Sequence, residues 1–78
     1  MATLRLFAQA REAAGTRSVE IDAATVGEVL VSARSQFGEA FGAIVDGSKV
    51  WLNGAPADAL DAVGASDEVA VLPPVSGG

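Results

Sequence analysis

The chain contains no cysteine and no histidine among its 78 residues. These absences exclude disulfide bonds, thiolate nucleophiles, zinc sites of the usual Cys/His kind and the commonest general base at neutral pH. Basic residues are also scarce. The chain has 5 lysines and arginines against 10 aspartates and glutamates, which gives a formal net charge of -5. This balance opposes binding to nucleic acid and favours a basic protein partner.

Long apolar runs and common enzyme motifs are missing as well. No segment approaches the roughly 20 apolar residues of a membrane span, and Arg5 interrupts the N-terminal segment. We therefore expect no membrane contact, no signal peptide and a cytoplasmic location. The motifs of phosphate, dinucleotide, serine-nucleophile and metal-binding loops do not occur. We expect no catalytic residues, no metal and no cofactor bound by this chain.

Half of the residues are apolar, which is enough for one modest core, and their spacing predicts the elements. Alternation predicts strands at 3–7, 17–22, 49–53 and 68–72, whose inward residues include Leu4, Leu6, Val19, Ile21, Val69 and Val71. A turn is expected at 8–15. A further strand at 43–45 is expected before the turn pair Asp46-Gly47, and Asn53-Gly54 predicts a second turn.

One amphipathic helix is expected in the middle of the chain. Thr25 and Glu28 are spaced as a capping box, and Gly38 stands where a helix terminator belongs. Between them, apolar residues recur at helical spacing at Val26, Val29, Leu30, Ala33 and Phe37. The order of elements predicts an α+β protein of the β-grasp type: a mixed sheet, parallel first and last strands, and one main helix packed across one face.

The same alternation predicts an apolar patch on the opposite face of the sheet. Phe7 and Leu72 would point away from the helix, and Trp51 would join them if Val50 and Leu52 are the inward pair. An uncovered patch of this kind usually indicates a partner. The alternative is that loops cover the face or that Trp51 caps the edge of the core.

The last residues differ in character from the rest. Pro73 and Pro74 end the last strand because they lack an N–H group, so we divide the chain into a domain at 1–72 and a tail at 73–78. The tail reaches about 20 Å when extended, and Gly77 and Gly78 carry no side chains. Its reactive group is the α-carboxylate of Gly78, which can be activated as an acyl-adenylate and converted to a thiocarboxylate. The acidic residues Asp58, Asp61, Asp67 and Glu68 are interpreted as solvated loop charges.

Three segments carry a resemblance to a known family. They are Phe7-Ala8-x-x-Arg11-Glu12-x-x-Gly15, Leu52-Asn53-Gly54, and residues 67–78 with the ending Pro73-Pro74-Val75-Ser76-Gly77-Gly78. Together they resemble the small subunit of molybdopterin synthase, a ubiquitin-like sulfur carrier with the β-grasp fold. The resemblance implies that an E1-like adenylyltransferase uses ATP to activate Gly78 and that a sulfur-donor enzyme supplies the sulfur. The thiocarboxylate would then act inside the large synthase subunit, in a heterotetramer, to build the dithiolene of molybdopterin from a pyranopterin precursor.

The resemblance also assigns roles to residues. Gly78 and Gly77 match the reactive tail, and the implied contacts with the partner are Phe7, Leu72, Pro73, Pro74 and Val75. Arg11 and Leu60 fall near further contact positions, although a solvated charge and a loop anchor explain them equally well. Other functions remain open: a sulfur carrier for thiamin or cysteine synthesis, a ubiquitin-like protein modifier, or an adaptor whose tail is incidental.

Overall fold

The computed structural model describes residues 1–74 of the chain. The elements in chain order are β1 (Ala2–Leu6), α1 (Ala8–Ala14), β2 (Ser18–Ile21), α2 (Val26–Phe37), α3 (Glu39–Asp46), β3 (Lys49–Leu52), β4 (Ala55–Pro56) and β5 (Glu68–Leu72). No helix within residues 1–74 is long and apolar enough to cross a membrane. The proposed division at residue 72 stays a prediction, because most of the tail lies outside the described residues.

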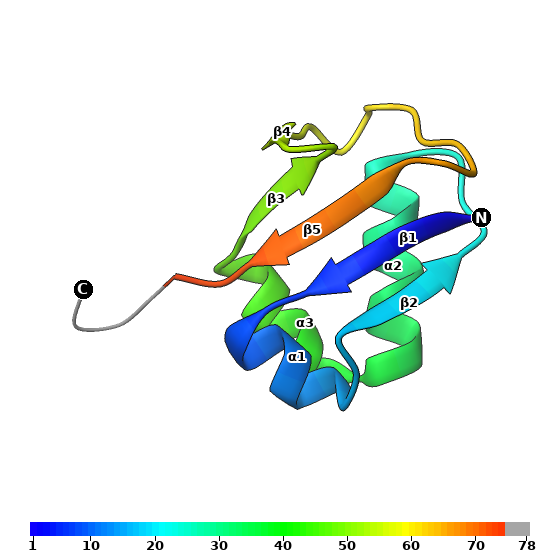
Figure 1. Cartoon of the computed structure of the whole chain (residues 1–78). Helices are drawn as coiled ribbons and strands as arrows, with labels where there is room; N and C mark the ends of the chain where they lie inside the picture. The colour runs from blue at the N-terminus through cyan, green and yellow to red at the C-terminus, as the bar shows by residue number, and fades with distance from the viewer. Residues whose placement is uncertain (75–78) are drawn as a thin grey trace.

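The strands form one five-stranded sheet in the order β2-β1-β5-β3-β4 (Figure 1). The central strands β1 and β5 are parallel, whereas β2, β3 and β4 pair antiparallel with their neighbours. The register places Leu4 beside Val69 and Leu6 beside Val71, so the inward residues of both central strands share one face. The β-grasp fold with parallel first and last strands is confirmed.

The helices of residues 1–74 all cover the same face of the sheet (Figure 1). The core lies between them and is formed mainly by Leu4, Leu6, Ala10, Val26, Val29, Ala33, Phe41, Val45, Val69 and Val71. Burial of each large aliphatic or aromatic side chain contributes about 1.5–3 kcal/mol, so this layer supplies most of the stabilisation. Within residues 1–74, no helix lies over the opposite face of the sheet.

Helix α2 begins and ends as the sequence predicts. The Thr25 hydroxyl oxygen accepts a hydrogen bond of 3.2 Å from the Glu28 N–H, and the Glu28 carboxylate accepts one of 3.1 Å from the Ala24 N–H. The second contact reaches one residue further back than in the usual capping box. Gly38 follows the helix with a φ of 96°, a conformation that favours glycine.

Three segments differ from the sequence-based expectation. Residues 8–14 form helix α1 instead of a turn, and only Ala10 of this helix is buried, so the segment has little apolar periodicity. The strand predicted at 43–45 is wrong, because these residues belong to α3. Phe41 and Val45 are both buried and lie one helical turn apart, a spacing that identifies the helix in retrospect. Ala55 and Pro56, which follow the predicted turn and for which no strand was expected, form the short edge strand β4.

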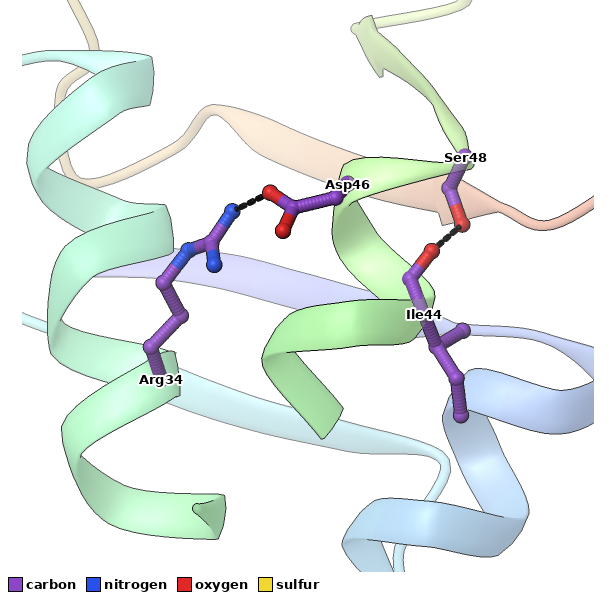
Figure 2. A network of polar contacts seen from close by, with 4 residues as sticks. All are labelled: Arg34, Ile44, Asp46 and Ser48. Atoms are coloured by element: carbon purple, nitrogen blue, oxygen red, sulfur yellow. Dashed lines mark hydrogen bonds and ion pairs between the residues drawn. The ribbon is translucent and has the colours of Figure 1, made fainter. Parts of the chain in front are cut away.

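Helices α2 and α3 are joined by an ion pair that the sequence did not reveal (Figure 2). The guanidinium of Arg34 donates a hydrogen bond to the carboxylate of Asp46. This hydrogen bond holds the pKa of Asp46 below its ordinary value and raises the pKa of Arg34. At the end of α3, the Ser48 hydroxyl donates to the Ile44 carbonyl oxygen at 2.6 Å (Figure 2). The end of the helix is thereby tied to Ser48, the residue that precedes strand β3.

Candidate functional site

The uncovered face of the sheet is the candidate site, and strand alternation decides which side chains point toward it. Because Val69 and Val71 are buried in the core, Ala70 and Leu72 of the same strand point the other way. On β3, Trp51 lies opposite Ala70, and Val50 and Leu52 lie opposite the buried valines. Val50 and Leu52 pack against the core. The conditional prediction that Trp51 faces outward is therefore confirmed.

Phe7 completes an apolar patch on this face. It directly follows Leu6, whose neighbour on the parallel strand is Val71, so Phe7 comes beside the position of Leu72. Its side chain is 39% exposed, and its backbone is still extended at a φ of -128° and a ψ of 154°. We call Phe7, Trp51, Ala70 and Leu72 the outer patch. Its last three members are half-buried by their neighbours.

Positive charge borders the outer patch. The Arg5 guanidinium lies 5.8 Å from the centroid of the Phe7 ring, within the range of a cation–π contact. Arg5 also pairs with Glu68 at 3.6 Å, with both side chains about half exposed, so this ion pair adds little stability. Lys49 lies opposite Leu72 on the neighbouring strand. The outer patch thus has cations at its edge although the whole chain is acidic, a local balance that net charge does not reveal.

The path from the sheet to the tail begins at the end of β5, beside the outer patch (Figure 1). Pro73 is buried and Pro74 is exposed, so of these two residues Pro74 presents the accessible surface. The remaining predicted tail residues, Val75, Gly77 and Gly78, lie outside the described residues. Their roles, and those of the two prolines as partner contacts, stay predictions.

The structure does not bring Leu60 and Arg11 to the outer patch. Leu60 lies in the loop between β4 and β5, beside Val31 on helix α2, on the helical side of the molecule. Its side chain is 85% exposed, so it does not anchor the loop to the core. Arg11 is exposed on α1, which packs against α3 on the same side. A partner that contacts the outer patch and these two residues together would have to wrap around the domain.

Three of the acidic residues interpreted as solvated loop charges, Asp58, Asp61 and Asp67, also accept backbone hydrogen bonds that hold the loop in place. The Asp67 carboxylate accepts hydrogen bonds from the Asn53 amide at 2.9 Å and from the Gly64 N–H at 2.7 Å. These two hydrogen bonds hold the pKa of Asp67 below its ordinary value, and the bond from Asn53 has the larger effect. The carboxylate of Asp61 accepts a bond of 2.8 Å from the Asp58 N–H. In residues 1–74, no group of three or more His, Cys, Asp or Glu side chains is arranged to hold a metal ion.

Comparison with known proteins agrees with this geometry. The model of the ThiS family matches residues 4–78, which is nearly the whole chain. The chain belongs to the ThiS family. Its members are ubiquitin-like proteins of the sulfur-carrier and modifier type, and the resemblance drawn from the sequence is confirmed at this level.

Relatives of this ThiS-family chain carry different names. Small archaeal modifier protein 1 of Haloferax volcanii is 41% identical over 85 residues, which cover 95% of this chain and 97% of that protein. The crystal structure of SAMP1 from Haloferax volcanii matches with a TM-score of 0.88 and 36% identity, over 99% of this chain and 98% of that one. A putative molybdopterin converting factor, subunit 1, from Pyrococcus furiosus matches with a TM-score of 0.83 and 25% identity, over 95% and 97% of the two chains.

A more distant solved structure contains a partner. It is the complex of subunits 1 and 2 of molybdopterin-converting factor from Helicobacter pylori, with a TM-score of 0.69 and 24% identity over 99% of this chain and 97% of that one. At this identity the likeness shows the shared fold alone.

Proposed function

We propose that this chain is the sulfur-carrying small subunit of a molybdopterin synthase. The observation that carries the proposal is the outer patch, an apolar surface without a helix over it at the end of the strand that leads into the Gly77-Gly78 tail. A partner that covers this patch holds the start of the tail in a fixed direction. The tail then has about 20 Å of reach into the partner.

The chemistry follows from the carboxylate of Gly78. A free carboxylate is a poor electrophile, so its oxygen first attacks the α-phosphate of ATP, and pyrophosphate leaves. Hydrosulfide supplied by a sulfur donor then attacks the carbonyl carbon of the acyl-adenylate, AMP leaves, and the carbonyl carbon carries a thiocarboxylate. Sulfur passes from there to the pyranopterin precursor. The E1-like enzyme and the large subunit supply the catalytic groups, and this chain supplies the docking surface and the acyl group.

The composition of the outer patch suits a partner that binds and leaves. Aromatic side chains such as Phe7 and Trp51 dominate binding energies when a partner buries them. The cations Arg5 and Lys49 at the border would pair with carboxylates of the partner and accelerate association. The relationship to the Pyrococcus furiosus protein named as a converting factor subunit, 25% identical, supports this assignment.

A second candidate function is protein modification. It is supported by the 41% identity to a protein named as a small archaeal modifier. Activation of Gly78 would be the same, but a lysine amine would then attack its carbonyl carbon, displace AMP and form an isopeptide bond. Lys49 is the only lysine, so a second copy could attach only there or at the N-terminus, and extended polymers are not expected.

Intact-mass spectrometry separates these functions. The chain is incubated with the adenylating enzyme, ATP and a sulfur donor, and we expect an oxygen-to-sulfur mass increase confined to the C-terminal peptide. The modified chain is then mixed with the large subunit and the pterin precursor, and molybdopterin is measured. A control chain that lacks Gly78 should give neither signal.

The outcomes discriminate clearly. A carboxylate that stays unmodified under these conditions rejects the carrier proposal. A thiocarboxylate that yields no molybdopterin places the chain in another sulfur-accepting pathway, such as thiamin or cysteine synthesis. Isopeptide conjugates to lysines of other proteins, formed in the host and lost when Gly78 is removed, would support the modifier function.

A further inference from the structure

A second surface feature lies on the other side of the molecule from the outer patch. It is an open groove of about 520 Å³ along helix α2, lined by Gly27, Val31, Ala59 and Leu60 with Asp22 and Glu28 at its rim. Its volume falls within the range of about 300–1,000 Å³ typical of binding pockets. We call it the α2 groove.

The groove displays two large apolar side chains that the fold does not bury. Leu60 is 85% exposed and Val31 is 66% exposed, whereas Val29 and Ala33 of the same helix are completely buried. Val31 therefore lies on the solvent side of α2, and Leu60 extends the same apolar strip from the facing loop. Single exposed apolar residues are common, but a pair lining one groove marks a surface that gains free energy when it is covered.

The loop that carries Leu60 is held firmly on the helix. The N–H groups of Val26 and Gly27 donate to the carbonyl oxygens of Asp61 and Ala59, both at 2.9 Å. Both donors belong to the first turn of α2, where the backbone N–H groups find no acceptor within the helix. The Leu60 N–H donates to the Asp58 carboxylate at 3.0 Å. Leu60 is thus presented to solvent by an ordered backbone, and little conformational entropy would be lost on binding.

Gly27 makes this close approach possible. A Cβ atom at this position would lie 3.0 Å from the Ala59 carbonyl oxygen and 3.3 Å from the Ala59 Cβ, closer than such atoms normally come. A glycine near the start of a helix lowers helix stability, so its presence here fits a position where the loop must touch the helix. Sequence spacing alone does not show this contact.

Charge identifies the occupant. The groove lining contains the acidic residues Asp22 and Glu28 and no lysine or arginine. In the loop, Asp58 and Asp61 flank the lining residues Ala59 and Leu60 in the sequence. A symmetric contact between two copies of the chain would bring these carboxylates against one another, and the like charges oppose it. We propose that the α2 groove binds a protein segment that places an apolar side chain between Val31 and Leu60 and flanks it with lysine or arginine.

The position of the groove adds a functional consequence. The groove is lined by residues at the start of helix α2. Helix α2 lies on the helix-covered side of the sheet, whose opposite face carries the outer patch (Figure 1). A partner in the groove therefore leaves the outer patch uncovered. The domain could bind two proteins at the same time, one through each surface. This inference does not depend on which sulfur or conjugation pathway the chain serves.

The test uses nuclear magnetic resonance of the full chain labelled with ¹⁵N. The probe is a synthetic hexapeptide of leucines flanked by arginines, and the matched control replaces every arginine with glutamate. At about 1 mM peptide, a range suited to weak contacts, the arginine peptide should shift the amide signals of Gly27, Val31, Ser32 and Leu60. The glutamate peptide should not shift them.

Matched variants locate the interaction. Leu60→Ser should weaken binding of the arginine peptide at least about tenfold, since it removes one apolar contact. Asp22→Asn should weaken it about two- to fivefold, and this difference should vanish near 1 M salt, where the Debye length is about 3 Å. Glu12→Gln, a change of equal charge on exposed α1, should leave binding unaltered.

Three results would overturn the proposal. Shifts that map to the outer patch would mean that the peptide binds elsewhere, and equal shifts with the glutamate peptide would remove the charge argument. Shifts at the groove that grow with protein concentration and without peptide would show that a second copy covers it. The absence of any shift with the arginine peptide would show that the groove does not recognise this chemistry.

Discussion

Gly27→Ala should destabilise the fold although alanine is the better helix former. In an ordinary helix this change stabilises by up to about 1 kcal/mol. Here the new Cβ would lie 3.0 Å from the Ala59 carbonyl oxygen. Relief of this contact requires the loop to move away from hydrogen bonds of 2.9 Å that Val26 and Gly27 donate to it.

The expected size follows from the opposing contributions. Overpacking costs about 1–3 kcal/mol, and a weakened hydrogen bond costs about 0.5–1.5 kcal/mol. After the helix gain of up to about 1 kcal/mol is subtracted, we expect a net loss of about 0.5–3.5 kcal/mol in the free energy of unfolding. For a domain of this size each loss of about 1 kcal/mol lowers the melting temperature by about 4–8 °C.

The chain offers a matched control in Gly42→Ala, the same substitution in helix α3. There the new Cβ would meet the Arg34 Nη1 atom at 3.0 Å, which is the far end of a flexible and partly exposed side chain. The guanidinium can move aside at the expense of its exposed ion pair with Asp46, which contributes about 0–1 kcal/mol. Because the helix gains up to about 1 kcal/mol, we expect stability that is nearly unchanged or slightly raised. Gly27→Ala should therefore lower the free energy of unfolding, whereas Gly42→Ala should leave it nearly unchanged or raise it.

Urea unfolding measures both variants. Circular dichroism reports the helices and fluorescence reports Trp51, the only tryptophan of the chain. Coincident transitions justify a two-state treatment, and an unchanged slope with a shifted midpoint indicates an effect on stability alone. If Gly27→Ala changed the free energy of unfolding no differently from Gly42→Ala, the loop would not be held against the helix. The account of the α2 groove would then be wrong.

Further predictions concern charge, the outer patch and the tail. Asp67 has a lowered pKa in the folded chain, so its stabilising effect is complete above its ordinary pKa of 3.8 and is lost as the pH falls through the folded value. Asp67→Asn should therefore reduce the loss of stability at acid pH, measured as the urea midpoint against pH; we call this part of the curve the acid limb. Phe7→Asp should weaken binding to the large synthase subunit at least about tenfold while the chain stays folded, because Phe7 is 39% exposed and aspartate is favourable at the helix N-cap. Removal of Gly78 should abolish adenylation, followed by ATP–pyrophosphate exchange, without change in melting temperature.

Each of these predictions has its own control. Glu12→Gln changes an exposed carboxylate on α1 and should leave the acid limb as it is; an equal effect of both variants would refute the role of Asp67. Leu6→Asp, one residue before Phe7 but 2% exposed, should prevent folding. If Phe7→Asp also unfolded the chain, the assignment of Phe7 to the outer patch would be wrong. Adenylation of a chain without Gly78 would contradict the proposed chemistry.

Local patterns in the sequence were sufficient for much of the fold. Alternation located β1, β2, β3 and β5 to within about one residue at each end, because a strand with one buried face must alternate. The capping box identified the start of α2, since the first turn of a helix needs acceptors for its free N–H groups. The turn at Asn53-Gly54 was also readable, because both residues have positive φ, 51° and 84°, which this pair tolerates well.

Short helices were harder to predict. Helix α1 buries only Ala10, so it lacks the apolar stripe that reveals a helix, and it is stabilised by its neighbours in the fold. In α3 the consecutive apolar residues 43–45 suggested a strand, whereas the buried pair Phe41 and Val45 required a helix. Packing against α1 and α2 decided between these alternatives. Local preference is a weak guide when the tertiary contacts favour another structure.

The candidate surfaces divide in the same way. The sequence by itself predicted Phe7 and Leu72 on the uncovered face, because a strand with one buried face must alternate. The sequence also identified the reactive group proposed for the tail, the α-carboxylate of Gly78. The structure decided that Trp51 joins Phe7 and Leu72, since Val50 and Leu52 are the inward pair of β3. Tertiary structure alone decided that Leu60 lies beside Val31, nearly thirty residues earlier in the chain. That contact depends on how a loop without periodicity folds back onto a helix, and no local pattern encodes such a long-range approach.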